Sequence, residues 1–400
     1  MDLKPTGDLH ELFRRLVDIE SVSMHEAPIA DAVEEALAPY KHLEVTRLGN
    51  SVVARTHLGR SERVVIAGHL DTVPVVENLP SRVERRSDGD YLVGRGTCDM
   101  KGGIAVALAL AASLERPARD VTWAFYECEE IAAEYNGLER IASQRPDLLD
   151  GDFAILMEPT DSRVEGGCQG TMRFTLEVAG RAAHSARSWA GHNAIHDLGA
   201  VLERLNRWQE RDPFVEVDGL TFHEGLNATM VEAGVAGNVI PPNATIQINY
   251  RYAPDKTTEQ ARQYMEGLFD EWPMTILDLS APARPGLDRP LAKSFVAVVG
   301  GEPGPKYGWT DVARFGQLGI PAVNFGPGNA LCAHQADECC RLGSLDECHR
   351  ALHTWLTSDG GFPVSARQFA GGCDNQANLG RVRITDDLTE VVVQFCCWEI

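Results

Sequence analysis

Short apolar runs recur in the first part of the chain, and polar residues, glycine or proline bound each of them. Three runs are continuous rather than alternating, at residues 64–67, 121–126 and 153–157. Continuous runs of this length are typical of strands that are buried on both faces of a parallel sheet. A longer run of small apolar residues at 102–114 predicts a buried helix packed against that sheet. The pattern therefore predicts an α/β fold, with a mixed, mostly parallel sheet and helices on both of its faces.

The periodicity changes after residue 168, where a strand with alternating apolar and polar positions begins. Its two faces would be Met172, Phe174, Leu176 and Val178 on one side, and Thr171, Arg173, Thr175 and Glu177 on the other. Helices near 193–208 and 257–271 follow, with strands near 227–233, 244–252 and 275–279. This β-α-β-β-α-β order is that of a ferredoxin-like unit with a half-exposed antiparallel sheet. We therefore expect a discontinuous domain at 1–168 and 287–358, interrupted by an inserted domain at 169–286.

The first domain would resume near residue 290 with a helix, a strand at 322–325 and a helix at 345–356. Beyond that helix, glycine and proline at 360–363 break the pattern. Residues 359–400 would form a poorly packed extension, in which 381–385 and 389–395 could pair as a hairpin. We expect no chemistry from this tail.

Candidate metal ligands lie in five separate motifs along the first domain. They are His69, Asp99, Glu130, Glu158 and His334. Three of these positions fall just past the carboxyl end of an apolar run, and ligands of open α/β sheets bind at that edge. Each motif alone is more often a structural histidine or a solvated acid, but the ordered set predicts a two-metal hydrolase. Asp99 has two oxygens and is the candidate to bridge two cations.

Composition favours a large cytoplasmic protein. The 400 residues are 44% hydrophobic and 24% charged, which is enough for two cores. A net charge of -21 argues against nucleic acid and membrane partners, because a phosphate-binding face needs clustered Lys and Arg. No apolar run is long enough to cross a bilayer, and no signal peptide is visible. The ten cysteines lack paired spacing, which favours reduced thiols, but Cys332, Cys339 and Cys340 near His334 leave a thiolate ligand open.

These motifs resemble a known family, the dinuclear zinc amidohydrolases, which include aminoacylases, glutamate carboxypeptidases, acetylornithine deacetylase and succinyl-diaminopimelate desuccinylase. The resemblance runs from an amphipathic helix predicted directly after residue 8 to about residue 357. Further matching segments lie at 180–185, 191–194, 237–242, 308–315 and 325–328. The sequences Tyr-Glu-Cys-Glu-Glu at 126–130 and Ala-His-Ser-Ala-Arg-Ser-Trp at 183–189 are most similar to the actinobacterial-type succinyl-diaminopimelate desuccinylases.

The resemblance implies a role for each candidate residue. One metal would take His69 and Glu158, the other Glu130 and His334, and Asp99 would bridge them. Zinc is the expected metal, although cobalt and manganese also suit carboxylate and imidazole ligands. The Asp71 carboxylate would accept the other N–H of the His69 ring and so set its tautomer. Glu129, which is not needed as a ligand, would be the general base.

The resemblance also implies a homodimer that forms through the inserted domain, which would act as a lid. His184 would reach the oxyanion from the partner subunit. The substrate-binding candidates are Asn238, Arg251 and Thr310, together with Gly326 and Gly328, whose backbone is expected to be unhindered. Some family members carry a basic pair where this chain has Cys168 and Gln169, and Arg173 or Arg187 could compensate for it.

The expected reaction is hydrolysis of N-succinyl-LL-2,6-diaminopimelate to succinate and LL-2,6-diaminopimelate, a precursor of lysine and peptidoglycan. Two alternatives stay open. The first is another amidohydrolase of the same family, such as an acetylornithine deacetylase, a metallo-dipeptidase or a carboxypeptidase. The second is a non-catalytic binding protein on the same fold, which the joint presence of all five ligands and Glu129 disfavours.

Overall fold

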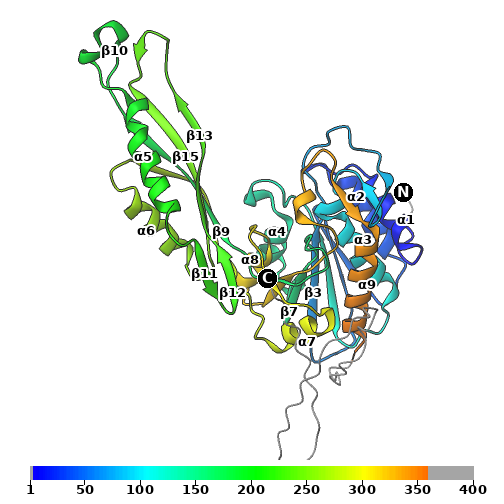
Figure 1. Cartoon of the computed structure of the whole chain (residues 1–400). Helices are drawn as coiled ribbons and strands as arrows, with labels where there is room; N and C mark the ends of the chain where they lie inside the picture. The colour runs from blue at the N-terminus through cyan, green and yellow to red at the C-terminus, as the bar shows by residue number, and fades with distance from the viewer. Residues whose placement is uncertain (1–2, 359–400) are drawn as a thin grey trace, which may run out of the picture. The chain divides into compact units, whose positions relative to one another are not determined.

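The computed structural model describes residues 3–358, and its largest sheet has eight strands in the order β1-β2-β6-β3-β7-β18-β8-β17 (Figure 1). The strands are β1 (Glu44–Leu48), β2 (Ser51–Arg55), β3 (Arg63–His69), β6 (Asp120–Tyr126), β7 (Phe153–Leu156), β8 (Glu165–Gly166), β17 (Gly304–Pro305) and β18 (Ala322–Asn324). The four central strands β6, β3, β7 and β18 run parallel, whereas β1, β2 and β8 pair antiparallel to a neighbour. The predicted mixed, mostly parallel sheet is confirmed.

Helices cover both faces of this sheet because the side chains of each central strand alternate between two cores. In β3, Val64 and Ile66 enter one hydrophobic cluster, and Val65 and Ala67 enter the other. The first cluster includes residues of α1 (Leu9–Val17), α2 (Ala27–Leu37), α3 (Gly102–Ser113), α7 (Pro290–Val299) and α9 (Leu342–Thr357). The second includes residues of α4 (Gly137–Gln144) and α8 (Val312–Gln317).

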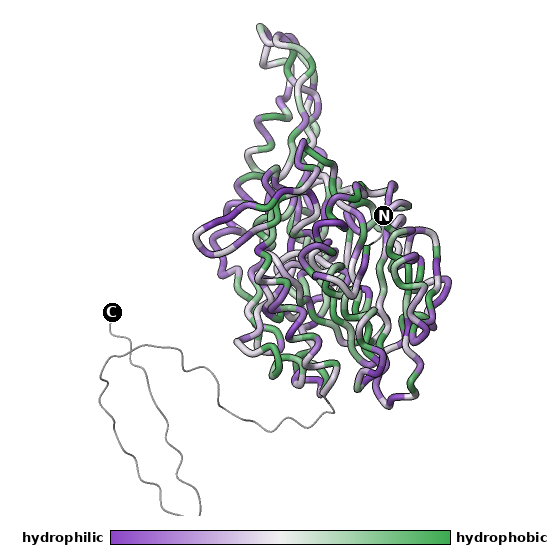
Figure 2. The backbone as a smooth tube through the Cα atoms, turned by 90° about the vertical axis from the view of Figure 1, so that its right-hand side faces the viewer, coloured by the Kyte–Doolittle hydropathy of each residue, from purple (hydrophilic) through white to green (hydrophobic). Residues whose placement is uncertain are grey.

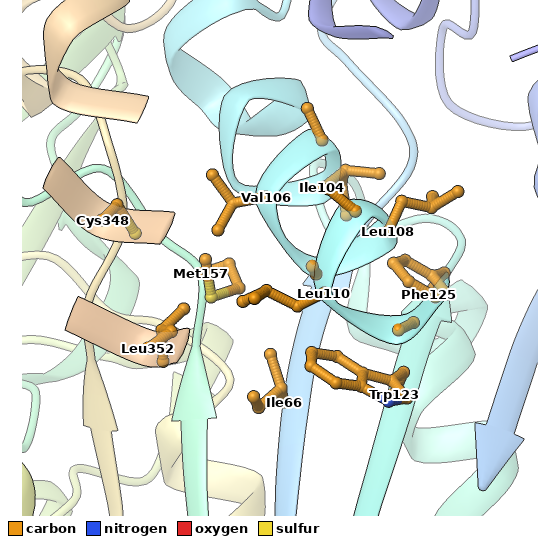
Figure 3. Close-up of a cluster of buried hydrophobic side chains, with 14 of the residues drawn as sticks. Ile66, Ile104, Val106, Leu108, Leu110, Trp123, Phe125, Met157, Cys348 and Leu352 are labelled. Carbon is orange, nitrogen blue, oxygen red and sulfur yellow. The ribbon is translucent and has the colours of Figure 1, made fainter. Parts of the chain in front are cut away.

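The helix α3 is the centre of the first core. Nearly all of its residues are buried, and none is charged, so it packs on several sides at once. Figure 3 shows its apolar side chains above Ile66, Trp123 and Phe125 of the sheet, with Cys348 and Leu352 of α9 alongside. The predicted helix at 102–114 is confirmed almost to the residue.

A second sheet of four strands lies within residues 170–280, in the order β13-β15-β9-β16. Its elements are β9 (Gly170–Ala179), α5 (Ala194–Gln209), β13 (Gly225–Ala233), β15 (Asn243–Tyr252), α6 (Thr258–Leu268) and β16 (Met274–Ser280). All its pairings are antiparallel, and α5 and α6 pack against the apolar face that Met172, Phe174 and Leu176 form. The predicted β-α-β-β-α-β order is confirmed, while the domain boundaries at 168 and 286 stay a prediction.

Several short elements were not predicted, because each pairs with a segment that is distant in sequence or is itself only a few residues long. They are the sheet of β4 (Arg82–Arg86), β5 (Gly89–Val93) and β19 (Cys339–Arg341), the hairpin of β11 (Phe214–Val217) and β12 (Leu220–His223), and the pair β10 (Ala183–His184) and β14 (Val239–Ile240). The predicted hairpin at 381–385 and 389–395 lies outside the described residues.

Hydrophobic and hydrophilic segments alternate along the chain (Figure 2). Within residues 3–358, no helix combines the length and the apolar character that a membrane span requires. The apolar segments serve the two sheets and their helices instead.

Two glycine-to-alanine variants test how tightly α3 packs on the sheet. A Cβ on Gly103 would lie 2.3 Å from the Met157 carbonyl oxygen and 2.7 Å from its Cβ, whereas nothing lies within 4 Å of a Cβ on Gly199 in α5. Gly103→Ala should therefore destabilise the protein by about 1–3 kcal/mol. Gly199→Ala, the matched control, should stabilise it by up to about 1 kcal/mol. Denaturant unfolding would measure both, and equal stabilities of the two variants would contradict the close approach.

Candidate metal centre

Three adjacent parallel strands carry candidate ligands to one edge of the central sheet. His69 is the last residue of β3, Glu129 and Glu130 follow β6, and Glu158 follows β7. Since β6, β3 and β7 are neighbours that run in the same direction, their carboxyl ends meet. The convergence that the sequence predicts is present in the structure.

Asp99 reaches this edge from η1 (Thr97–Lys101), the irregular turn that precedes α3. Its Oδ1 lies 3.1 Å from Nε2 of His69. Donor atoms of His69, Asp99 and Glu130 lie within 4.8 Å of one another, which is close enough for one cation to contact all three.

His334 completes the set from the other side. Its Nε2 lies 2.9 Å from Oε1 of Glu130 and 3.4 Å from Oδ2 of Asp99. The strand β18 precedes it in the chain, and His334 lies just beyond the short helix η5 (Ala330–Cys332). Its φ is +64° and its side chain is 51% exposed, so its own packing holds it weakly.

The Asp71 carboxylate organises the turn that carries the acidic pair. Oδ1 accepts the amide hydrogen of Glu129 at 2.9 Å, and Oδ2 accepts that of Glu130 at 3.1 Å. Ser23 donates its hydroxyl to Oδ2 at 2.7 Å. His69 Nδ1 lies 3.0 Å from the Asp71 carbonyl and 3.4 Å from Oδ1, so the expected contact with the carboxylate is shared with the backbone.

Without a bound cation, the acidic groups of the site outnumber the basic ones, and several of their pKa values are shifted. Burial, followed by the charge of Asp99, raises the pKa of Glu158 to about 8. Burial, with Asp311, Glu158 and Glu130 nearby, also raises the pKa of Glu129 well above its usual range. Hydrogen bonds to Asp99 and Glu130 raise the pKa of His334 to about 10. Four acids and two imidazoles, of which His334 is half exposed, thus share one edge of the sheet, and a divalent cation is the group that such a donor set fits.

The Glu129 carboxylate makes no hydrogen bond to any residue between 3 and 358, whereas that of the adjacent Glu130 contacts His334. Its backbone is held by Asp71, and its side chain is free to face a bound molecule. The residue type, the fixed backbone and the raised pKa suit a group that accepts and releases a proton.

A family model described as peptidase family M20/M25/M40 matches residues 65–358. The chain belongs to this family. The match covers every candidate ligand together with the four-stranded sheet.

Two curated relatives match the M20 chain over nearly their whole length. A protein of Mycobacterium tuberculosis, named provisionally as succinyl-diaminopimelate desuccinylase DapE, is 52% identical over 89% of this chain and 99% of its own. The succinyl-diaminopimelate desuccinylase of Corynebacterium glutamicum is 41% identical over the same shares of the two chains.

Among solved structures, the Bacillus subtilis YXEP protein, described as a dinuclear metal binding peptidase from the M20 family, is similar with a TM-score of 0.63. The alignment covers 87% of this chain and 96% of that one, at 16% identity. At this identity the likeness concerns the fold.

The two predicted substrate-binding glycines, Gly326 and Gly328, do not offer free amides. The Gly326 amide donates to Thr160 Oγ1 at 3.1 Å, and the Gly328 amide donates to Ser344 Oγ at 3.2 Å. We correct the expectation that they present unhindered donors: Gly326 is needed because a Cβ would lie 2.3 Å from the Met157 carbonyl oxygen. Thr310 is also engaged, since its hydroxyl donates to Asn324 Oδ1 at 2.8 Å.

The remaining candidates lie on elements within residues 170–280. His184 ends β10 and its Nδ1 accepts the Ala186 amide hydrogen at 3.1 Å. Asn238 is exposed between β13 and β14, and Arg251 lies on β15 with its Nε donating to Asn249 Oδ1 at 3.2 Å. Within the described chain, none of the three makes a hydrogen bond to the five candidate ligands.

Two of the cysteines near His334 have other polar partners. Arg86 Nη1 lies 3.2 Å from Sγ of Cys339, and Sγ of Cys340 lies 3.6 Å from the Ser344 hydroxyl oxygen. A second group that could hold a metal, Glu26, Glu127 and Cys128, is explained by hydrogen bonds, because the Cys128 thiol donates to Glu26 Oε1 at 3.0 Å.

Ser23 and Lys306 are among the supporting residues that were missed in the sequence. Ser23 carries no signal beyond its polarity, because its role depends on a contact with Asp71 across 48 positions. Lys306 is buried beside Glu158, and its Nζ donates to the Pro159 carbonyl at 3.1 Å. Its sequence neighbours, Pro305 and Tyr307, gave no signal for this role.

The raised pKa values predict how the stability of metal-free protein depends on pH. Folded Glu158 and His334 bind protons more tightly than in the unfolded chain, where their usual values are 4.5 and 6.5. Their contribution is therefore present at low pH and is lost as pH rises through about 8 and about 10 respectively. We expect the thermal midpoint of chelator-treated protein to fall between about pH 6 and about pH 9.

The control is the same scan with a divalent cation in excess, which should flatten this fall because the cation replaces the protons. In the variant His334→Gln, the thermal midpoint should fall less steeply with pH than in wild type. A metal-free protein that is equally stable across this range would contradict the electrostatic description of the site.

Proposed function

We propose that this chain hydrolyses the succinyl amide of N-succinyl-LL-2,6-diaminopimelate, releasing succinate and LL-2,6-diaminopimelate. The observation that carries the proposal is the full-length match to the two relatives with that name, at 52% and 41% identity, combined with the clustered ligands. The reaction would serve lysine and peptidoglycan precursor synthesis in the cytoplasm.

The donor set supports a site for two divalent cations. His69 and Glu158 would hold one ion, and Glu130 and His334 the other. Asp99 would bridge them, since its Oδ1 faces His69 and its Oδ2 faces His334. Zinc suits this mixture of imidazole and carboxylate ligands, and cobalt or manganese would also fit.

When bound, such ions lower the pKa of a coordinated water toward about 7 and polarise the amide carbonyl. Glu129 would accept the proton of the attacking water at its carboxylate and then donate it to the departing amine. Asp71 holds Glu129 for this task through the backbone amide. Asp71 therefore acts on the base as well as on His69.

The partner subunit would supply His184 to stabilise the oxyanion, in a homodimer that forms through residues 169–286. Support comes from the position of His184, which is exposed on β10 and makes no contact with the metal candidates of its own described chain. Binding of the substrate carboxylates would fall to Arg251 and Asn238, whose side chains offer N–H donors, with Thr310 lining the site.

Substrate choice is tested with metal-stripped protein that is assayed with and without added zinc. The panel is N-succinyl-LL-diaminopimelate, N-acetylornithine and a set of dipeptides. We expect zinc-dependent hydrolysis with kcat/KM highest for the succinylated substrate. Zinc-dependent activity that prefers N-acetylornithine or a dipeptide would favour another amidohydrolase of the same family. Absence of any activity would favour a non-catalytic binding protein.

The role of Glu129 is tested by Glu129→Gln, which keeps the shape of the side chain and removes the base. We expect kcat to fall by roughly 10²–10⁴-fold while metal stoichiometry is unchanged, because Glu129 is not needed as a ligand. The matched control is Glu134→Gln, an exposed position a few residues further along, which should retain wild-type kcat. Retained turnover in Glu129→Gln would remove this residue from the mechanism.

A further inference from the structure

A buried ion pair lies directly behind the candidate ligands, and the reaction itself does not use it. Arg95 and Glu338 are 3% and 1% exposed, and Nη1 of Arg95 lies 2.7 Å from Oε2 of Glu338. Arg95 follows β5 and Glu338 precedes β19, two strands that pair with each other. The Gly94 amide also donates to the Glu338 carbonyl at 2.9 Å, so the two positions are held together by backbone as well as by charge.

The second oxygen of Glu338 holds the loop of the bridging aspartate. Oε1 accepts the amide hydrogens of Cys98 at 3.0 Å and of Asp99 at 3.1 Å. These amides lie in η1, where φ and ψ of Asp99 are not helical. The carboxylate of Glu338 thus fixes the backbone from which the Asp99 side chain projects.

The guanidinium of Arg95 holds two further loops of the site. Its Nη1 also donates to the carbonyl of Gln335 at 3.2 Å, next to His334, and its Nε donates to the carbonyl of Pro74 at 3.0 Å, shortly after Asp71. One ion pair therefore contacts the segments of Asp71, Asp99 and His334, which are far apart in the sequence.

General stability does not explain such a pair. A buried ion pair of this kind is often no more stable than apolar residues of the same volume, because both charges lose their hydration. An apolar pair, however, could not accept hydrogen bonds from two backbone amides, nor donate hydrogen bonds to two carbonyls of irregular loops. His334 needs such support most, since its side chain is half exposed and its φ is positive.

We propose that Arg95 and Glu338 are positioning residues that hold Asp99 and His334 at coordinating distance and so set the affinity of the centre for divalent cations. This inference rests on the proposed two-cation function. Outer partners that orient ligands typically change metal affinity by about 10–100-fold when they are replaced.

The test is titration of metal-free protein with Co²⁺, followed by the visible absorption of the bound ion, for wild type and for Glu338→Gln. Glutamine keeps the shape but loses the charge that pairs with Arg95. We expect the affinity for at least one Co²⁺ to fall about tenfold or more, with an altered absorption band because the ligand geometry changes. The ion that Glu130 and His334 would hold should be lost first.

The matched control is Glu224→Gln. Glu224 is also buried, and its Oε1 accepts from the Lys256 ammonium and from the Ala253 amide, both at 2.9 Å, but it contacts none of the candidate ligands. We expect this variant to lose thermal stability while its Co²⁺ affinity and absorption band stay those of wild type. A merely structural role of Glu338 would make the two variants alike.

Arg95→Lys covers the case in which Glu338→Gln does not fold. Lysine keeps the charge but cannot donate to Glu338, Gln335 and Pro74 in the same planar arrangement, so Co²⁺ affinity should still fall. Wild-type Co²⁺ binding in whichever of the two variants folds would overturn the inference. A wild-type protein that binds fewer than two Co²⁺ would instead contradict the two-cation function, and the comparison of affinities between variant and wild type would still decide the role of the pair.

Discussion

The carboxylate of Asp71 joins two strands of the central sheet at the edge where the site forms. It follows β3 by two positions, and its two oxygens accept the amides of Glu129 and Glu130 beyond β6. A carboxylate that accepts two backbone amide hydrogens fixes the direction of the side chains of the two donating residues. The backbone of the turn cannot rotate without losing a buried hydrogen bond. The different positions of the Glu129 and Glu130 carboxylates depend on this contact. The Glu130 carboxylate reaches His334, whereas no residue between 3 and 358 donates a hydrogen bond to that of Glu129.

The same edge concentrates negative charge in a place that water hardly reaches. Asp99 lies between two imidazoles: burial opposes its ionisation, but the hydrogen bonds from His334 and His69 still hold its pKa below the usual range. Among residues 3–358, no side chain donates a hydrogen bond to the carboxylates of Glu129 and Glu158, and burial raises their pKa values. A centre of this kind gains most from divalent cations, since each cation removes the repulsion between carboxylates and replaces protons on the imidazoles. Metal binding, stability and protonation are therefore coupled in the physical description of this protein.

The core elements were readable from the sequence where the local pattern and the burial agree. The continuous apolar runs became β3, β6 and β7, and the alternating residues from Met172 to Val178 became the inner face of β9. The start of α6 was also close to the predicted residue 257, since Thr257 and Gln260 form a capping box, whereas the helix ends at Leu268 and not at 271. The sheet of β4, β5 and β19 escaped prediction because its third strand lies more than 200 residues after the first two and is only three residues long. A strand this short has no periodicity of its own, and only its partner defines it.

The sequence by itself determined the chemistry that is available: His69, Asp99, Glu129, Glu130, Glu158 and His334 stand in recognisable motifs, and three of these segments follow apolar runs whose carboxyl ends must meet in a parallel sheet. Only the tertiary structure decided which groups hold them. Ser23 on Asp71, Glu338 on the amide of Asp99 and Arg95 on the carbonyl of Gln335 are contacts between polar residues with no pattern in the chain. Hydrogen bonds of buried side chains depend on distances of a few tenths of an ångström between distant segments, and such distances exist only after the chain has folded.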